Sequence, residues 1–140
     1  MTDPVLSSLV RINRQRIRDL RRRLAPFGYL GVMHLIVLYV RRHPGARQED
    51  VACFYAVDKT SVARDARRLE DMGHLRREVD PDNRRQYQLY LTGAGRDMLP
   101  LLEAAYQAFS AKLSAGISDE DWQTLQALLK RLEENSSPEG

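Results

Sequence analysis

Two adjacent arginines stand in the most polar stretch of the sequence, DPDNRR at residues 80–85. A guanidinium group can bind phosphate through two parallel hydrogen bonds, and it can also read a guanine edge. A second group of small polar and basic residues opens the segment DKTSVAR at 58–64. These residue types favour binding of nucleic acid. The residues concerned are Lys59, Thr60, Ser61, Arg64, Arg84 and Arg85, together with Arg67, three positions after the segment 58–64.

The net charge of +3 conceals an uneven distribution along the chain. Residues 1–96 carry 19 basic and 11 acidic side chains, a balance of +8, whereas residues 97–140 carry 3 and 8, a balance of −5. Nearly all the basic residues are arginine. A GC-rich genome also favours arginine over lysine, so the position of the charge is stronger evidence than its type. The basic part of the chain is the part expected to meet a polyanion.

The length of 140 residues suits one domain, or one domain with a dimerisation element. The start MTDPVLSS predicts no signal peptide, and no apolar run has the length of a membrane span. With a single cysteine we expect no internal disulfide and a soluble, cytoplasmic protein. The sequence lacks a glycine-rich phosphate loop, a nucleophile motif and a metal-ligand spacing among its histidines, so no enzyme, cofactor or metal site is predicted.

The first half of the chain predicts four helices. Apolar residues recur at three- and four-residue steps over 3–24, and Pro26 and Gly28 follow as breakers. The apolar run over 29–40 predicts a buried helix, and a short helix is expected over 48–55. Asp58 is a suitable N-cap for the next helix, which Gly73 ends.

The second half predicts a hairpin and two further helices. Strands are expected over 75–79 and 86–91, where Tyr87, Leu89 and Leu91 alternate with polar neighbours. Thr92 is expected to cap one long helix over 93–115. Ser118 is expected to cap the last helix.

Two short helices, a tight turn and a hairpin follow one another in the order of a winged helix-turn-helix. A recognition helix buries one side in its own domain and presents small polar and cationic groups to the major groove. A hairpin with arginine at its tip can reach the minor groove or the phosphate backbone. The expected fold class is therefore mainly α with a small β-hairpin: a winged helix-turn-helix plus a helical dimerisation region.

Residues 58–95, DKTSVARDARRLEDMGHLRREVDPDNRRQYQLYLTGAG, resemble the MarR (multiple antibiotic resistance regulator) family. The resemblance implies one domain over 1–140, with the DNA-binding winged helix at 30–92 and helical dimerisation parts at 3–26 and 93–135. It implies a homodimer that represses or activates transcription at a palindromic operator in double-stranded DNA. Of these we expect a repressor that is released by a small aromatic or anionic effector. It places Arg84 at the wing tip, surrounded by Asp82, Asn83 and Arg85.

The wing departs from the family pattern at Asn83, where an aspartate is usual. That aspartate typically orients the neighbouring arginine. Asn83 can accept a hydrogen bond but brings no charge, so we expect the wing arginine to be held less firmly.

Two other residues have a structural and a functional interpretation. Cys53 lies between Ala52 and Phe54 and is expected to be a small core residue, the alternative being a redox-sensing regulator that uses it. His34 is expected to be a hydrogen-bonded core histidine. The alternative is an effector pocket formed by Tyr29, Met33, His34 and Tyr39. A different class of function, a winged helix that binds protein instead of DNA, also stays open.

Overall fold

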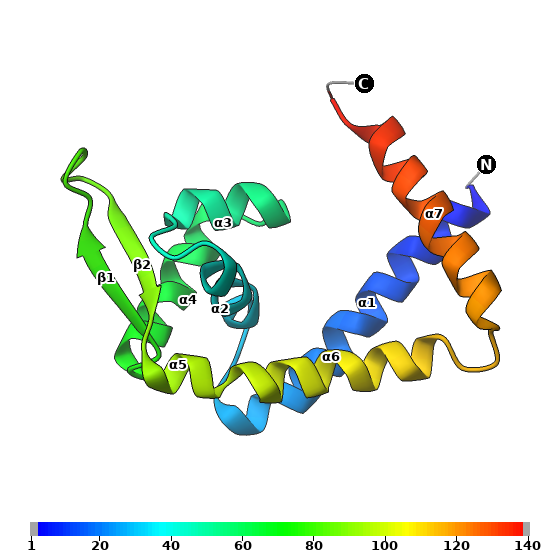
Figure 1. The fold of residues 1–140 in the computed structure, drawn as a ribbon, viewed down its shortest axis with the longest axis horizontal. Coiled ribbons are helices and arrows are strands. Elements are labelled where there is room, and N and C mark those ends of the chain that lie inside the picture. The colour runs from blue at the N-terminus through cyan, green and yellow to red at the C-terminus, as the bar shows by residue number, and fades with distance from the viewer. Residues whose placement is uncertain (1–2, 139–140) are drawn as a thin grey trace. The chain divides into compact units, whose positions relative to one another are not determined.

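The computed structural model describes residues 3–138 of the chain (Figure 1). It divides into two compact units, Met1–Tyr106 and Gln107–Gly140. The first unit holds all the elements up to the start of α6, and the second holds the end of α6 and α7. No helix in the described part is both long and apolar enough to cross a membrane. The elements are α1 (Pro4–Leu24), η1 (Ala25–Phe27), α2 (Met33–Arg42), α3 (Gln48–Tyr55), α4 (Lys59–Asp71), β1 (Leu75–Val79), β2 (Tyr87–Leu91), α5 (Gly93–Asp97), α6 (Leu99–Leu113) and α7 (Asp119–Ser136).

The predicted N-caps are confirmed. Asp58 caps α4 by accepting a hydrogen bond from the Ser61 backbone N–H, and Ser118 caps α7 in the same way through Asp121. Thr92 caps α5. Each cap satisfies an amide that the first helical turn leaves without a partner. The short-range signals in the sequence therefore set where these helices begin.

The hairpin is antiparallel, with Leu75 opposite Leu91 and Val79 opposite Tyr87. A bridge between Ala46 and Leu89 adds the loop before α3 to the free edge of β2. The fold is thus mainly α with one small hairpin, as predicted, and α2 to β2 form a winged helix-turn-helix.

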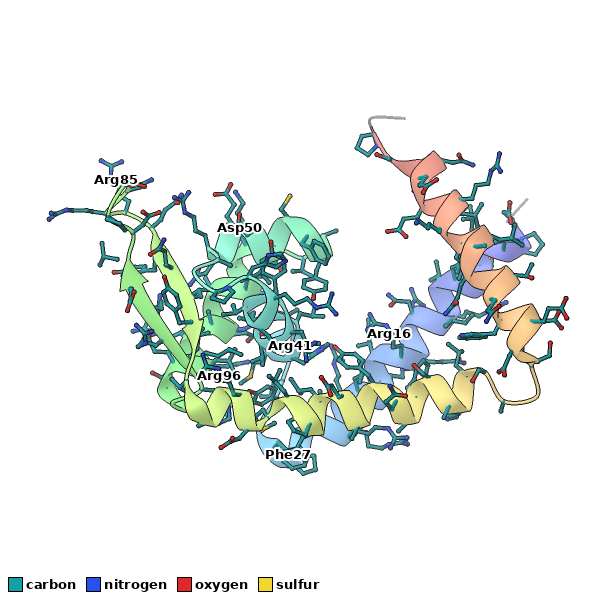
Figure 2. The ribbon with its side chains drawn as sticks, viewed as in Figure 1. Arg16, Phe27, Arg41, Asp50, Arg85 and Arg96 are labelled. Atoms are coloured by element: carbon teal, nitrogen blue, oxygen red, sulfur yellow. The ribbon has the colours of Figure 1, made fainter. Side chains whose placement is uncertain are left out.

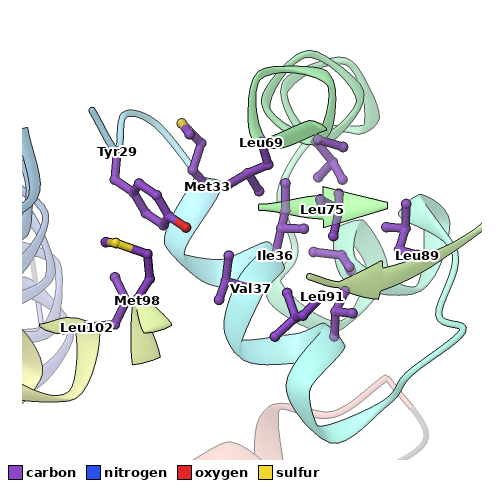
Figure 3. Packing of buried hydrophobic residues seen from close by; sticks show 14 of the residues in the cluster. Tyr29, Met33, Ile36, Val37, Leu69, Leu75, Leu89, Leu91, Met98 and Leu102 are labelled. Atoms are coloured by element: carbon purple, nitrogen blue, oxygen red, sulfur yellow. The ribbon is translucent and has the colours of Figure 1, made fainter. Parts of the chain in front are cut away.

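The core of the first unit lies where α2 meets α4 and the hairpin (Figure 3). Met33, Ile36 and Val37 of α2 are fully buried, and Leu69 of α4 and Leu89 of β2 pack in the same cluster. Burying such a side chain stabilises the fold by about 1.5–3 kcal/mol. This core fixes the buried side of α4 and leaves its other side to solvent.

The prediction of a helix over 29–40 is wrong at its start, because α2 begins at Met33. Gly28 and Gly31 both have positive φ, which interrupts helical geometry. A Cβ at Gly31 would lie 2.4 Å from Asp65 Oδ2, so only glycine fits this approach. The Val32 N–H donates to that same Oδ2 at 2.8 Å. A contact with α4, and not a local cap, sets the start of α2.

The predicted single helix over 93–115 is two helices, α5 and α6, separated at Met98. Pro100 has no N–H to donate to Arg96, and its ring crowds that carbonyl. The Met98 N–H instead makes a tight turn by donating to Gly95 O at 3.2 Å. The presence of Pro100 in the sequence already indicated that the helix would be interrupted here.

Two burial predictions are also wrong. Cys53 is exposed, because successive helical residues are about 100° apart and α3 turns Val51, Ala52 and Tyr55 inward. Tyr87 is 45% exposed, although Leu89 and Leu91 on the same face are buried. It lies at the wing end of β2, beyond the core, where the Arg77 guanidinium stacks over its ring.

Candidate nucleic-acid interface

The N-terminus of α4 is held rigidly by its cap. Asp58 accepts hydrogen bonds from the Ser61 N–H at 2.8 Å and from the Ser61 hydroxyl at 2.6 Å. These bonds hold the pKa of the Asp58 carboxyl below its usual range. Lys59 and Thr60 beside the cap are exposed, and Lys59 makes only a loose ion pair with Glu49 at 3.7 Å. The first turn of α4 therefore presents a cation and a hydroxyl to solvent.

Further along α4, the two predicted arginines have different surroundings. Arg67 is exposed, and within residues 3–138 its side chain has no hydrogen bond or ion pair. Arg64 donates from Nε to Asp65 Oδ1 at 3.2 Å. Asp65 is fully buried and also accepts from Arg68 at 3.1 Å. Arg67 is thus free to bind an anion, whereas Arg64 is tied to a buried carboxylate.

The wing carries the remaining predicted residues, and Asp82, Asn83, Arg84 and Arg85 are all exposed. Figure 2 shows Arg85 at the tip of the hairpin. The Arg85 backbone N–H donates to Asn83 Oδ1 at 3.1 Å, so Asn83 accepts a hydrogen bond from the backbone of the wing and not from an arginine side chain. In the described part of the chain neither wing arginine has a side-chain partner. Both guanidinium groups are available to a ligand.

One hollow of about 220 Å³ is lined by residues of the wing, of α3 and of α4. It is lined by Arg47, Gln48 and Glu49 at the start of α3, by Lys59 of α4, and by the segment 85–87 of the wing. Two predicted residues 26 positions apart, Lys59 and Arg85, therefore border the same small depression. With three cations and one acid, this surface suits a polyanion.

The sequence-based search missed Arg47 and Asp80, which join α3 to the wing by an ion pair. The Asp82 backbone N–H and the Arg47 guanidinium hold the pKa of Asp80 below its usual range, so this carboxylate is charged at neutral pH. Arg47 lies 33 positions before Asp80, and no local pattern links the two. Asp65 was missed because it stands on the buried side of a basic helix.

A larger cavity of about 710 Å³ lies in the first unit. Of the four predicted pocket residues, Tyr29 and His34 line this cavity and the other two do not. Met33 is buried in the core, and Tyr39 packs against the rings of His43, Phe54 and Tyr55. The charged residues of the lining are all arginine: Arg16, Arg21 and Arg64.

His34 is the histidine in the lining of this cavity. Its Nδ1 is hydrogen-bonded to the Tyr106 hydroxyl, as a satisfied histidine requires. Burial lowers the pKa of His34 to about 4, and Arg16 adds to the shift while Asp65 opposes it. Burial raises the pKa of Tyr106 to about 12. Both groups are neutral at pH 7, so the arginines set the positive potential of the cavity.

A helix-turn-helix followed by a hairpin, with free cations on both, defines a winged helix-turn-helix protein. A family model described as MarR family matches residues 33–87. A crystal structure of MarR is 30% identical, with a TM-score of 0.84 over 96% of this chain and 98% of that one. The chain belongs to the MarR family.

Two further relatives bear on function. A putative transcriptional regulatory protein for the hcr operon of Thauera aromatica is 33% identical over 105 residues. That match covers 75% of this chain but only 61% of the Thauera protein's length. A putative MarR family transcriptional regulator from Listeria monocytogenes, solved in complex with a 26mer DNA, has a TM-score of 0.86 over 96% of this chain and 89% of that one. At 20% identity it shows the shared fold.

Proposed function

We propose that this chain is a sequence-specific regulator of transcription that binds double-stranded DNA through α4 and the wing. The observation that carries the proposal is the set of uncovered cations on these two elements: Arg67 on α4, and Arg84 and Arg85 at the wing tip. Unpaired guanidinium groups in water gain most by binding phosphate or base edges. The structural neighbour from Listeria was solved with DNA, which supports the same ligand class here.

Each predicted residue has a role in this proposal. Thr60 and Arg67 face the major groove from the exposed side of α4. Lys59 and Ser61 lie in the first turn, where backbone amides also favour a phosphate. Arg84 and Arg85 extend along the duplex, with Asp82 and Asn83 shaping the turn that carries them. Arg64 contributes from the edge of the groove if it leaves Asp65.

Binding-site selection from a random duplex library, followed by fluorescence anisotropy on the selected site, tests this function. We expect a selected sequence with two-fold symmetry and at least a hundredfold preference over a scrambled duplex. Arg96→Ala serves as the control for the wing variant Arg84→Ala, since Arg96 is an exposed arginine on α5 (Figure 2). If the selection enriches no sequence and the protein binds no duplex tightly, the proposal is contradicted.

We also propose that the functional form is a homodimer joined through α1, α6 and α7. Apolar side chains are exposed on α1, including Val5, Leu6 and Val10, and on α7 at Leu128 and Leu132. Such stripes usually bury against another helix. Sedimentation of the full chain should give a dimer, and deletion of α7 should abolish it. A folded monomer of the full chain would contradict this assembly.

We further propose that a small anionic, partly aromatic effector binds in the cavity of about 710 Å³ and releases the DNA. Apolar side chains such as Ile17 and Leu38 supply the dry wall, while Arg16 and Arg21 attract the acid group. Arg64 and Ser61 of α4 also line it, so an occupant can displace the recognition helix. Titrating substituted benzoates into the protein–DNA complex should lower anisotropy. Arg16→Gln should reduce that response more than it changes DNA affinity.

Two alternatives remain distinguishable by experiment. A protein-binding winged helix would retain the fold but show no preference among duplexes. The exposure of Cys53 supports the hypothesis of a redox-sensing regulator, although the chain contains no second cysteine for an internal disulfide. DNA affinity that falls with peroxide in the wild type but not in Cys53→Ser would favour redox sensing.

A further inference from the structure

Asp80 is a buried carboxylate in an otherwise exposed wing. It is 2% exposed, whereas residues 81–85 immediately after it are all exposed. Its Oδ1 accepts the Asp82 backbone N–H at 2.9 Å, and its Oδ2 accepts the Arg47 guanidinium. A buried carboxylate is stable only when its oxygens are paired in this way.

The backbone of Asp80 also organises the turn. Its carbonyl accepts the Asn83 N–H at 3.2 Å, and its N–H donates to Gln86 O at 3.0 Å. The Gln86 N–H in turn donates to Asn83 O at 2.9 Å. The loop that carries Arg84 and Arg85 is therefore closed by hydrogen bonds that converge on one residue.

Arg47 reaches this loop because of an unusual helix start. It occupies the N-cap position of α3, where a side chain that accepts hydrogen bonds is preferred. A guanidinium cannot accept, so the cap consists only of Asp50 Oδ2 accepting the Arg47 N–H at 2.9 Å. The Arg47 side chain is thereby free to extend away from α3, and it pairs with Asp80.

The hairpin has a second attachment to the segment that precedes α3. The Gly45 N–H donates to Leu89 O at 2.8 Å, and the Leu89 N–H donates to Ala46 O at 2.8 Å. This backbone pairing holds the middle of β2. The ion pair holds the end of the hairpin next to the turn. Two attachments at different points along one hairpin fix its direction, whereas one would allow it to pivot.

We propose that Arg47 and Asp80 form a latch that fixes the wing arginines relative to the recognition helix, so that both elements meet one DNA duplex. The inference rests on the proposed DNA-binding function. Arg47 and Asp80 are positioning residues, and the contacts with DNA are made by Lys59, Arg84 and Arg85. The hollow bordered by Arg47, Lys59 and Arg85 is the space that the latch keeps open.

The sign of one substitution separates this latch from simple electrostatics. Removing a negative charge from a DNA-binding face strengthens attraction to phosphate. If Asp80 only repels DNA, Asp80→Asn binds more tightly. If Asp80 positions the wing, Asp80→Asn binds about fivefold to tenfold more weakly, the scale of one lost wing contact. Glu78→Gln is the matched control, since Glu78 is an exposed acid on the same hairpin and should bind equally or more tightly.

A double-mutant cycle with Arg47→Gln shows whether the two residues act as one unit. The latch predicts that the double variant binds about as weakly as either single variant. It also predicts that Asp80→Asn and Arg47→Gln change the salt dependence of affinity by the same amount, because both release the same wing contact. Additive losses, with a salt slope reduced by about one for Arg47→Gln and not for Asp80→Asn, would show that Arg47 binds phosphate by itself and would overturn the latch.

A measurement without DNA keeps this result distinct from the function itself. Amide hydrogen exchange at Asp82, Asn83 and Gln86 should be faster in Asp80→Asn and in Arg47→Gln than in the wild type. Thermal unfolding confirms that each variant is folded. If the wild type fails to bind DNA at low salt, the proposed function fails. Unchanged wing exchange in both variants, or equal or tighter DNA binding by Asp80→Asn, overturns the latch.

Discussion

The recognition helix and the wing are held in place by different forces. Val62, Ala66 and Leu69 of α4 are completely buried, so tight apolar packing fixes the helix. Residues 81–85 of the wing are all exposed, so apolar packing does not hold this turn. Hydrogen bonds around Asp80 hold it instead. Apolar packing is insensitive to charge and salt, whereas a polar network is not. The helix is thus the rigid part of the surface, and the wing is the part open to adjustment.

The strongest test of this contrast is Leu69→Ala. The substitution removes a fully buried side chain from the core-facing side of the recognition helix and should lower the free energy of unfolding by about 2–5 kcal/mol. Chemical denaturation measures this loss. By contrast, Arg84→Ala at the wing should leave stability within about 0.5 kcal/mol of the wild type. Equal losses in the two variants would contradict the distinction.

Acid should weaken the buried helical region through His34. The folded pKa is about 4, below the usual value of 6.5. Between these values the unfolded chain takes up a proton that the folded chain refuses, so stability falls as pH decreases from 6.5 to 4. The loss due to His34 reaches at most about 3 kcal/mol, and the His34 contribution to stability is constant above pH 7. The wild type should lose more stability over this window than His34→Gln. Parallel pH curves for the two proteins would show that His34 is not protected from protons.

Removing one wing cation should affect binding without affecting folding. Arg84→Ala should weaken DNA binding by about 1–2 kcal/mol and reduce the salt slope by about one, because the side chain is exposed and has no partner among residues 3–138 to lose. Arg96→Ala is the control for loss of one positive charge. If both variants lose the same affinity, the wing arginine acts only through net charge.

The smallest expected effect concerns Asn83. Replacing it with aspartate supplies a charged acceptor beside Arg84 and Arg85, which pre-organises a guanidinium for binding. The added charge also repels phosphate, so the net gain should be only about twofold in affinity. Anisotropy titrations of Asn83→Asp and the wild type, run in parallel, would resolve this difference. A clear loss of affinity would mean that the carboxylate does not orient the arginine.

Local signals allowed much of the fold to be predicted. Asp58, Thr92 and Ser118 each accept a hydrogen bond from an amide three residues further on, so their helix starts could be inferred from sequence. β1 has the predicted bounds, and β2 begins at Tyr87, one residue after its predicted start. The cations proposed to bind DNA, Lys59, Arg67, Arg84 and Arg85, are exposed, as their polar local sequence indicated. They needed no partner to be recognised.

The predictions failed where long-range contacts decide the structure. The start of α2 depends on Asp65, which lies 33 positions away in sequence. The pairing of Arg47 with Asp80 spans the same separation and has no pattern that would reveal it. Cys53 was placed in the core from its neighbours alone, whereas the packing of α3 decides which side faces inward. The residues that position the site were therefore harder to predict than those proposed to contact DNA.

The most direct test of the central claim is the salt dependence of DNA binding by the wild type and by the variant Arg84→Ala, Arg85→Ala. Anisotropy is measured on one selected duplex from about 50 to 200 mM salt, a range over which several phosphate contacts change affinity by orders of magnitude. We predict tight binding at low salt, a steep loss with rising salt, and a slope reduced by about two in the double variant. Absence of binding at the lowest salt, or an identical slope for both proteins, would contradict the account.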